Sequence, residues 1–260
     1  MLELGFFDSK QKAQSCIMTN GVSINGKLVN KPGFQINYSK FLEHYQNDSE
    51  YIKVADKFLA YVSRGAYKLQ TAAKKYKLNF SNKIVLDIGA STGGFCDFVL
   101  QHEAQKVIAL DVGKGQLHYK LQQDTRVLNL EEINFRFWQM QELGEDCQID
   151  MVLCDVSFIS ILIILERLKE LISTKPNKFN ANLEIIFLLK PQFEAGKKIM
   201  DKCQGVLKDE KLIQEICDQS CQAINKLGFQ VLDICPSELK GAKGNQEFLL
   251  NLQLDPVIFA

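Results

Sequence analysis

The sequence predicts an α/β fold: a mostly parallel sheet covered by helices on both faces, preceded by a small separate unit. Three observations support this. From residue 61 onward, short strand-like runs alternate with helical stretches. A helix–hairpin pattern occupies the N-terminus, and a polar stretch of mixed charge separates the two parts. We therefore divide the chain into a unit at 1–40, a linker at 41–60 and a main domain at 61–260.

Composition sets limits on the class of protein. The chain has 260 residues, of which 46% are hydrophobic and 24% are charged, which suits one full α/β domain with a small accessory unit. No apolar run approaches the roughly 20 residues that span a bilayer, and the N-terminus lacks the apolar core of a signal peptide. The eight cysteines include no CxxC pair, which favours reduced buried thiols in a cytoplasmic protein and no metal site.

The first 40 residues carry a helix and a tight hairpin. Residues 8–22 predict the helix, with Asp8 or Ser9 as its N-cap and Gly21 after its end. The apolar residues on either side of Asn25-Gly26 then predict two short strands joined by a two-residue turn.

This stretch resembles the α-L RNA-binding module of ribosomal small-subunit protein four, in which a helix and its adjoining loop present cations to RNA phosphates. The family usually starts with a longer first helix that carries Arg-Leu-Asp, so we expect the start of that helix to be missing here. The resemblance implies RNA contacts for the lysines of the stretch, which are Lys10, Lys12, Lys27 and Lys31.

The main domain alternates strands and helices. The strand-like runs are 84–88, 106–110, 126–130, 150–154, 183–189, 228–234 and 246–254. The helical stretches between most of them are 64–77, 94–102, 161–172 and 208–227. The last two strands are joined by a loop alone, which indicates an antiparallel hairpin at the sheet edge. Such a seven-stranded, Rossmann-like sheet is typical of class I methyltransferases, although the pattern alone leaves a Rossmann-type dehydrogenase open.

The strongest local signal follows the first of these strands. The apolar run ends in Asp87, passes through a glycine-rich turn and opens a helix. Gly89 permits a close backbone approach by a ligand, while Gly93 and Gly94 let the helix begin beside the sheet. The pattern predicts a cofactor-binding turn made by Asp87, Gly89, Ala90, Ser91, Thr92, Gly93, Gly94 and Phe95.

Asp111 ends the next strand, followed by Val112, and a carboxylate there can accept both ribose hydroxyls of an adenosine cofactor.

Two rival interpretations share the glycine-rich motif. Its spacing, G-x-x-x-G-G, differs from the G-x-G-x-x-G of NAD enzymes. It also satisfies the G-x-S-x-G nucleophile elbow of α/β-hydrolases. A hydrolase needs a late triad histidine, however, and no histidine follows His118.

Six motifs in order along the main domain carry a family likeness. They are YVSRGAYKL (61–69), LDIGASTGGF (86–95), ALDVGKGQLH (109–118), CDVSFIS (154–160), LKPQFE (189–194) and GNQEFLL (244–250). Together they are similar to the TlyA family, whose members are named as haemolysins and known as ribosomal RNA 2′-O-methyltransferases related to the FtsJ family. The resemblance implies S-adenosylmethionine as methyl donor and a ribosomal RNA or ribosomal subunit as substrate, with a cytidine as the modified nucleotide.

The resemblance also implies a catalytic set. FtsJ-type enzymes use Lys–Asp–Lys–Glu, which falls here on Lys68, Asp155, Lys190 and Glu247. A ribose hydroxyl is a weak nucleophile, so a nearby ammonium would stabilise its developing charge, or a neutral lysine would accept its proton. Lys190 is predicted to be central, with Lys68 lowering its pKa and positioning the ribose, and the carboxylates orienting both lysines. The carboxylates oppose that lowering, so the net effect on the pKa stays open.

Two further residues match a family motif, E-x-x-N-x-R, that is expected near the adenine of the cofactor. They are Glu131 and Asn134. Asp155 is also expected to touch the cofactor, since it ends a strand at the same edge of the sheet.

The net charge of zero conceals two basic segments. Residues 1–40 carry five lysines against two acids, and residues 61–83 carry six cations and no acid. Clustered cations suit an anionic partner, so Arg64 and Lys68 are also predicted to contact RNA.

Two other functions remain as alternatives: a membrane-active haemolysin, and an RNA-binding ribosome-assembly factor without catalytic activity.

Overall fold

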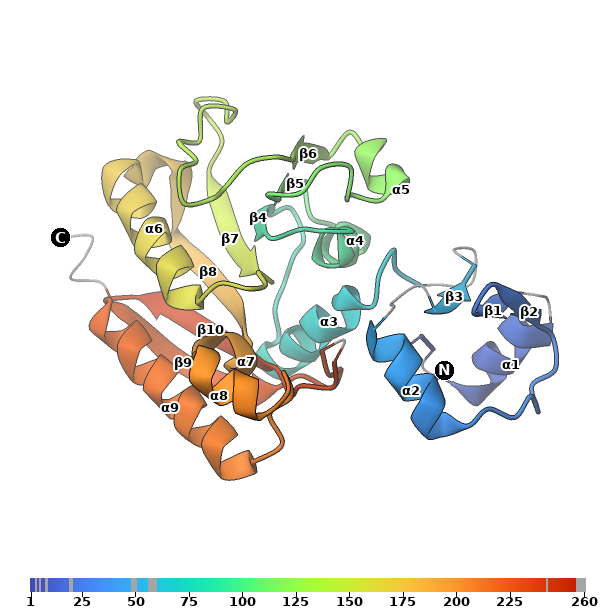
Figure 1. The fold of residues 1–260 in the computed structure, drawn as a ribbon. Coiled ribbons are helices and arrows are strands. Elements are labelled where there is room, and N and C mark those ends of the chain that lie inside the picture. Colours follow the sequence, from blue (N-terminus) through green and yellow to red (C-terminus); the bar gives the residue numbers. More distant parts are fainter. Residues whose placement is uncertain are drawn as a thin grey trace.

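The computed structural model describes residues 1–2, 4, 6–7, 9–18, 21–47, 51–55, 60–241 and 243–255. They form two units (Figure 1). The smaller, N-terminal unit lies beside helix α3 (Gly65–Tyr76) of the main domain.

The N-terminal unit packs two helices against a three-stranded antiparallel sheet of strand order β2-β1-β3. Its elements are α1 (Lys10–Met18), β1 (Val22–Ile24), β2 (Lys27–Val29), α2 (Tyr38–Asn47) and β3 (Ile52–Val54). The predicted turn is confirmed: Asn25 and Gly26 have positive φ angles of 48° and 71°, as the tight turn between β1 and β2 requires. The Ser9 hydroxyl accepts a hydrogen bond from the backbone N–H of Lys12 and so caps α1. Asp8, the alternative cap, lies outside the described residues.

The stretch 41–60 differs from the linker that its polar composition predicted. It contains most of α2 and all of β3, and β3 pairs antiparallel with β1. Only one face of α2 is apolar, and its buried residues Phe41 and Tyr45 lie one helical turn apart in the core of the unit. A helix with so few apolar positions has the polar composition of a linker in the sequence. The N-terminal unit therefore continues to Ala55 instead of ending at residue 40.

The main domain is built on the predicted seven-stranded sheet, in the order β6-β5-β4-β7-β8-β10-β9. Its strands are β4 (Ile84–Ile88), β5 (Lys106–Leu110), β6 (Val127–Leu130), β7 (Ile149–Cys154), β8 (Phe179–Leu189), β9 (Phe229–Pro236) and β10 (Phe248–Leu254). The first five are parallel, and β10 runs antiparallel between β8 and β9. The predicted edge hairpin is therefore confirmed, and the α/β fold with it.

Helices cover both faces of this sheet. On one face α3 and α4 (Gly94–Gln101) pack on Val85, Val107 and Met151, among others. On the other face α6 (Ile161–Thr174) and α9 (Glu210–Lys226) pack on the alternate residues of the same strands, such as Leu86 and Ile108. Because both faces are buried, these strands are apolar throughout.

In the described part of the main domain, four short elements were not predicted. They are α5 (Tyr119–Gln122), the 3-10 turn Pro176–Lys178, α7 (Pro191–Glu194) and α8 (Lys197–Lys202). A single turn is too short to show helical periodicity in sequence. Helices α7 and α8 follow β8 directly and stand at its carboxyl end (Figure 1). Within the described part of the chain, no helix is both long and apolar enough to cross a membrane.

Candidate active site

A cavity of about 890 Å³ opens at the carboxyl ends of β4, β7 and β8. Part of its lining comes from the glycine-rich turn after β4, and another part from α7 and α8. All four residues of the predicted catalytic set, Lys68, Asp155, Lys190 and Glu247, also line it. Open parallel sheets bind ligands at this edge, because the loops that follow neighbouring strands diverge there.

The four side chains form one connected cluster with Asp155 between the two lysines. Nζ of Lys190 lies 2.6 Å from Oδ1 of Asp155, and Nζ of Lys68 lies 3.5 Å from Oδ2 of the same carboxylate. Lys68 also lies 2.8 Å from Oε2 of Glu247. Asp155 follows β7, Lys190 follows β8 and Glu247 precedes β10, while Lys68 lies on α3. Three neighbouring strands and one helix thus bring together residues that are distant in sequence.

Burial and charge act in opposite directions in this cluster. Burial alone would lower the pKa of Lys68, but the carboxylates of Asp155 and Glu247 outweigh it and raise the pKa above its usual value. Burial alone would raise the pKa of Asp155, but the two lysines hold it below the usual value. Lys68 is therefore an ammonium, and Asp155 a carboxylate, at neutral pH.

Two partners of the cluster were missed from sequence. Nζ of Lys190 donates a hydrogen bond of 2.8 Å to the hydroxyl of Ser157, and Nε2 of Gln192 donates one of 3.3 Å to Oε1 of Glu247. Ser157 and Gln192 lie in the motifs CDVSFIS and LKPQFE, each two positions after a predicted catalytic residue. Their closeness in sequence to Asp155 and Lys190 could have indicated a role in the site, but it does not show which way their side chains point.

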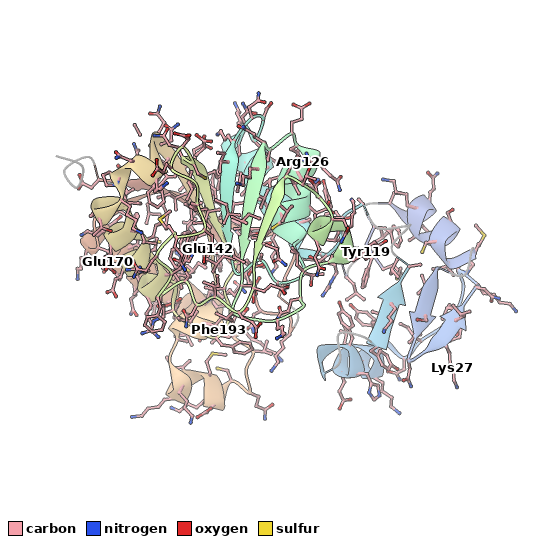
Figure 2. All side chains as sticks on the ribbon, turned by 90° about the horizontal axis from the view of Figure 1, so that it is seen from above. Lys27, Tyr119, Arg126, Glu142, Glu170 and Phe193 are labelled. Carbon is pink, nitrogen blue, oxygen red and sulfur yellow. The ribbon has the colours of Figure 1, made fainter. Side chains whose placement is uncertain are left out.

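The cavity rim carries further side chains that sequence analysis did not single out. Phe158 is 91% exposed and has a φ angle of 64°, a left-handed conformation that bulky residues rarely adopt. Its ring lies 5.1 Å from that of Phe193, which belongs to α7 and is labelled in Figure 2. Two exposed cations, Lys197 and Lys243, also line the cavity.

The glycine-rich turn lies against this four-residue cluster. Gly89 has a φ angle of 83°, and a Cβ atom there would lie 3.0 Å from the backbone oxygen of Asp155. Glycine therefore permits the close approach of this turn to Asp155. Asp87, which lines the cavity just before the turn, is buried, and its Oδ2 accepts a hydrogen bond from the thiol of Cys96 at 3.0 Å. Its Oδ1 is buried and has no hydrogen-bond partner within the described part of the chain, and burial raises the pKa of this carboxyl to about 7.

Asp111 stands at the end of β5, as predicted. One carboxylate oxygen accepts a hydrogen bond from the backbone N–H of Ser91 at 2.8 Å, and the other accepts one from Gly113 at 2.7 Å. Asp111 therefore ties the glycine-rich turn to the end of the neighbouring strand. Val112, beside it, is 67% exposed.

The residues expected near the adenine do not line the cavity. Glu131 accepts hydrogen bonds from the backbone N–H groups of Gly115, Gln116 and Leu117, which hold its pKa below the usual value. The Asn134 side chain accepts one from the backbone N–H of Arg136. Both residues thus order loops around the site, which is an ordinary role for a polar side chain after a strand.

The predicted RNA-binding cations separate into two groups. Lys10, Lys12, Lys27 and Lys31 are exposed on the N-terminal unit, and Figure 2 shows Lys27 on the side turned away from the main sheet. Lys68 instead lies inside the catalytic cluster.

Arg64 differs from its predicted role. Its guanidinium donates a hydrogen bond of 3.0 Å to the backbone oxygen of Leu4 and lies over the rings of Phe6 and Tyr45, at 5.3 and 5.2 Å. It therefore binds the N-terminal unit to the start of α3 instead of facing solvent. The aromatic rings and carbonyl come from segments whose packing beside residue 64 could not be read from sequence.

Comparisons with known proteins agree with this architecture. Residues 61–254 match the family model of FtsJ-like methyltransferases. The chain is 37% identical over 246 residues to "Hemolysin A" of Brachyspira hyodysenteriae, with 94% of each chain covered. It is 35% identical over 248 residues to "23S rRNA (cytidine-2'-O)-methyltransferase TlyA" of Campylobacter jejuni, with 92% of each covered. A solved structure of a protein assigned to the hemolysins, from Streptococcus thermophilus, has a TM-score of 0.71 and 33% identity over 97% of this chain and 86% of that chain. This chain therefore belongs to the FtsJ-like methyltransferase family.

Proposed function

We propose that the protein transfers the methyl group of S-adenosylmethionine to a ribose 2′-hydroxyl of ribosomal RNA, the activity for which the Campylobacter jejuni relative is named. The observation that supports it most directly is the cluster of Lys68, Asp155, Lys190 and Glu247 beside the glycine-rich turn. S-adenosylmethionine is the methyl donor of the FtsJ-like family. The substrate would be the RNA alone or a ribosomal subunit, with a cytidine as the modified nucleotide, and the site of action would be the cytoplasm.

The residues around the turn fit this cofactor. S-adenosylmethionine carries an ammonium group and two ribose hydroxyls, which are all hydrogen-bond donors. The buried, unpartnered Oδ1 of Asp87 suits the ammonium. Each oxygen of Asp111 accepts one backbone N–H and keeps a second lone pair for a hydroxyl. When bound, the cofactor supplies a methyl group on a positively charged sulfur.

Lys190 is the residue we place at the attacking hydroxyl. Its nitrogen has three positions for partners, of which Asp155 and Ser157 take two, so one remains for the substrate oxygen. The methyl carbon–sulfur bond would break as the new carbon–oxygen bond forms, so the hydroxyl proton has to be taken up in the same step. Nζ of Lys190 would take that proton on its lone pair, and Asp155 and Ser157 would stabilise the resulting ammonium. Lys68, fixed by Asp155 and Glu247, holds a permanent positive charge beside the reacting oxygen and orients the ribose.

The N-terminal unit, residues 1–55, is proposed to hold the RNA. Its exposed lysines, Lys10, Lys12, Lys27 and Lys31, would contact phosphates, as in the α-L modules that it resembles. This division of labour places affinity in the N-terminal unit and chemistry in the main domain.

The decisive experiment incubates the protein with tritium-labelled S-adenosylmethionine and either ribosomal RNA or purified subunits, and then maps 2′-O-methyl groups nucleotide by nucleotide. We expect label at one or a few ribose positions with the wild type and none with Lys190→Ala. Binding of RNA without any transfer of label would favour the assembly factor. Release of dye from liposomes without methyl transfer would favour the haemolysin.

A further inference from the structure

Gln192 occupies a particular place in the active-site cavity. It stands in the single turn of α7, two residues after Lys190, and lines the cavity. Its amide nitrogen donates to Oε1 of Glu247 at 3.3 Å, and Oε2 of the same carboxylate pairs with Lys68 at 2.8 Å. Gln192 is thus attached to the catalytic cluster through Glu247.

This contact fixes the orientation of the Gln192 amide. An ionised carboxylate only accepts hydrogen bonds, so it selects the NH₂ end of the amide and repels the oxygen end. The amide oxygen Oε1 must then point away from Glu247. Among the residues that the structure describes, this buried oxygen has no hydrogen-bond partner. Buried acceptors are rarely left unsatisfied in native proteins, so Gln192 offers an acceptor to a donor that the chain itself does not provide.

The position of Gln192 indicates which bound molecule carries that donor. The cofactor is assigned to the glycine-rich turn after β4, whereas Gln192 belongs to the segment after β8, next to Lys190, where the RNA ribose is placed. The 2′-hydroxyl of that nucleotide is engaged by Lys190 in the proposed reaction. The remaining donor on a cytidine is the exocyclic amino group of its base, where a uridine carries an acceptor oxygen instead.

We propose that Gln192 is a specificity-determining residue: its amide oxygen accepts a hydrogen bond from the exocyclic amino group of the base whose ribose is methylated. Gln192 thereby selects cytosine over uracil, since the carbonyl of uracil would face the amide oxygen with no proton between them. This inference rests on the proposed function, including its cytidine substrate, and names the residue that recognises the base.

The test uses the RNA fragment that carries the mapped methylation site, made with cytosine, uracil or pyrimidin-2-one at that nucleotide. Pyrimidin-2-one is cytosine without its amino group. Methyl transfer is measured with wild type and with Gln192→Met, which keeps a similar side-chain length but removes the acceptor. We expect the wild type to methylate the cytosine RNA about tenfold more efficiently than the other two, the effect of about one hydrogen bond.

Gln192→Met also removes the hydrogen bond to Glu247, so methyl transfer should fall by a common factor on all three RNAs. The diagnostic quantity is the ratio of transfer to the cytosine RNA over transfer to the pyrimidin-2-one RNA. That ratio should fall from about ten in the wild type to about one in the variant, because the side chain and the base then lack the same hydrogen bond. Gln253→Met, on the exposed side of β10, is the matched control and should behave as wild type. Affinity for S-adenosylmethionine should be unchanged in both variants. An unchanged ratio, whether or not transfer falls on all three RNAs, would overturn the role of Gln192. A wild type that methylates none of them would instead refute the proposed function.

Discussion

Nζ of Lys190 lies 2.6 Å from Oδ1 of Asp155. The two residues follow β8 and β7, which are parallel neighbours in the sheet. The register of the strands therefore sets the distance between a candidate base and the acid that stabilises its charged form, and no mobile loop has to close for the pair to form.

Lys190→Ala should lower the rate of methyl transfer by at least about a hundredfold, the usual contribution of a group that moves a proton. Affinity for S-adenosylmethionine should stay within about twofold, because Lys190 contacts Asp155 and Ser157 instead of the glycine-rich turn. Single-turnover transfer and calorimetric binding separate the two effects. Lys226→Ala, an exposed lysine in the last turn of α9, serves as the control. Near wild-type transfer by Lys190→Ala would refute its role.

Asp155→Asn should destabilise the fold by about 3 kcal/mol, because it leaves two lysines facing each other around a neutral amide. The folded pKa of Asp155 lies below its usual 3.8, so its stabilising contribution is present above that pH and is lost as the pH falls through the folded value. The pKa of Lys68 lies above its usual 10.5, so its contribution is complete below that pH and is lost as the pH rises through the folded value. Denaturant unfolding should therefore show a constant difference between variant and wild type from about pH 4 to 10. A difference that changed steeply near neutral pH would contradict this assignment.

Binding of S-adenosylmethionine should strengthen as the pH rises toward 7. Burial raises the pKa of Asp87 to about 7, and only the ionised carboxylate attracts the ammonium of the cofactor. Below that pH the affinity should fall by up to about tenfold per unit, and binding should release protons, which calorimetry in two buffers measures. Asp87→Asn should bind weakly and without this pH dependence between pH 5.5 and 7. If the wild type bound S-adenosylmethionine equally well from pH 5.5 to 7, Asp87 would not contact the ammonium of the cofactor.

Arg64→Ala should loosen the N-terminal unit, with a loss of about 2–3 kcal/mol from one charged hydrogen bond and two cation–π contacts. Arg64→Lys should behave almost as badly, because an ammonium lacks the flat guanidinium that lies over Phe6 and Tyr45. Hydrogen exchange of α2 reports the loosening, and Lys74→Ala on the same helix α3 is the control. If Arg64 contacted RNA phosphates instead, Arg64→Lys would retain RNA affinity and leave the exchange unchanged.

Replacing Lys27 and Lys31 together by alanine should weaken RNA binding and leave the transfer rate at saturating RNA unchanged. Log affinity falls linearly with log salt concentration, and each lost phosphate contact makes that negative slope shallower by about 0.7–0.9. Filter binding across a salt series measures that slope, with Lys226→Ala as reference. An unchanged slope would place the RNA elsewhere.

The family resemblance predicted all four residues that meet in the Lys–Asp–Lys–Glu cluster, and the residue pattern supports the meeting of two of them. Asp155 and Lys190 each follow an apolar strand whose end is visible in the residue pattern, and the carboxyl ends of neighbouring parallel strands converge. The residue pattern does not predict the direction in which a side chain points. The bonds from Ser157 to Lys190 and from Gln192 to Glu247 depend on rotamers that only the packed structure defines.

Polar residues were the least predictable class. Glu131 was assigned to the adenine because it matches the family motif E-x-x-N-x-R, and in the structure its oxygens accept hydrogen bonds from three backbone N–H groups of a nearby loop. Arg64 was assigned to RNA because it lies in a basic segment, yet it holds the N-terminal unit. In both cases the competing partner is a backbone group, which the residue types in a sequence do not reveal.

Strand β3 completes the sheet of the N-terminal unit, and this determines where chimeric proteins can be joined. A fragment cut after residue 40 would lack an edge strand and the helix that buries Phe41, so an autonomous fragment has to run through Ala55. A graft from a relative can be joined there. Since the Arg64 hydrogen bond ends on a main-chain oxygen, which nearly any residue supplies at position 4, the grafted unit would need matching aromatic rings at positions 6 and 45.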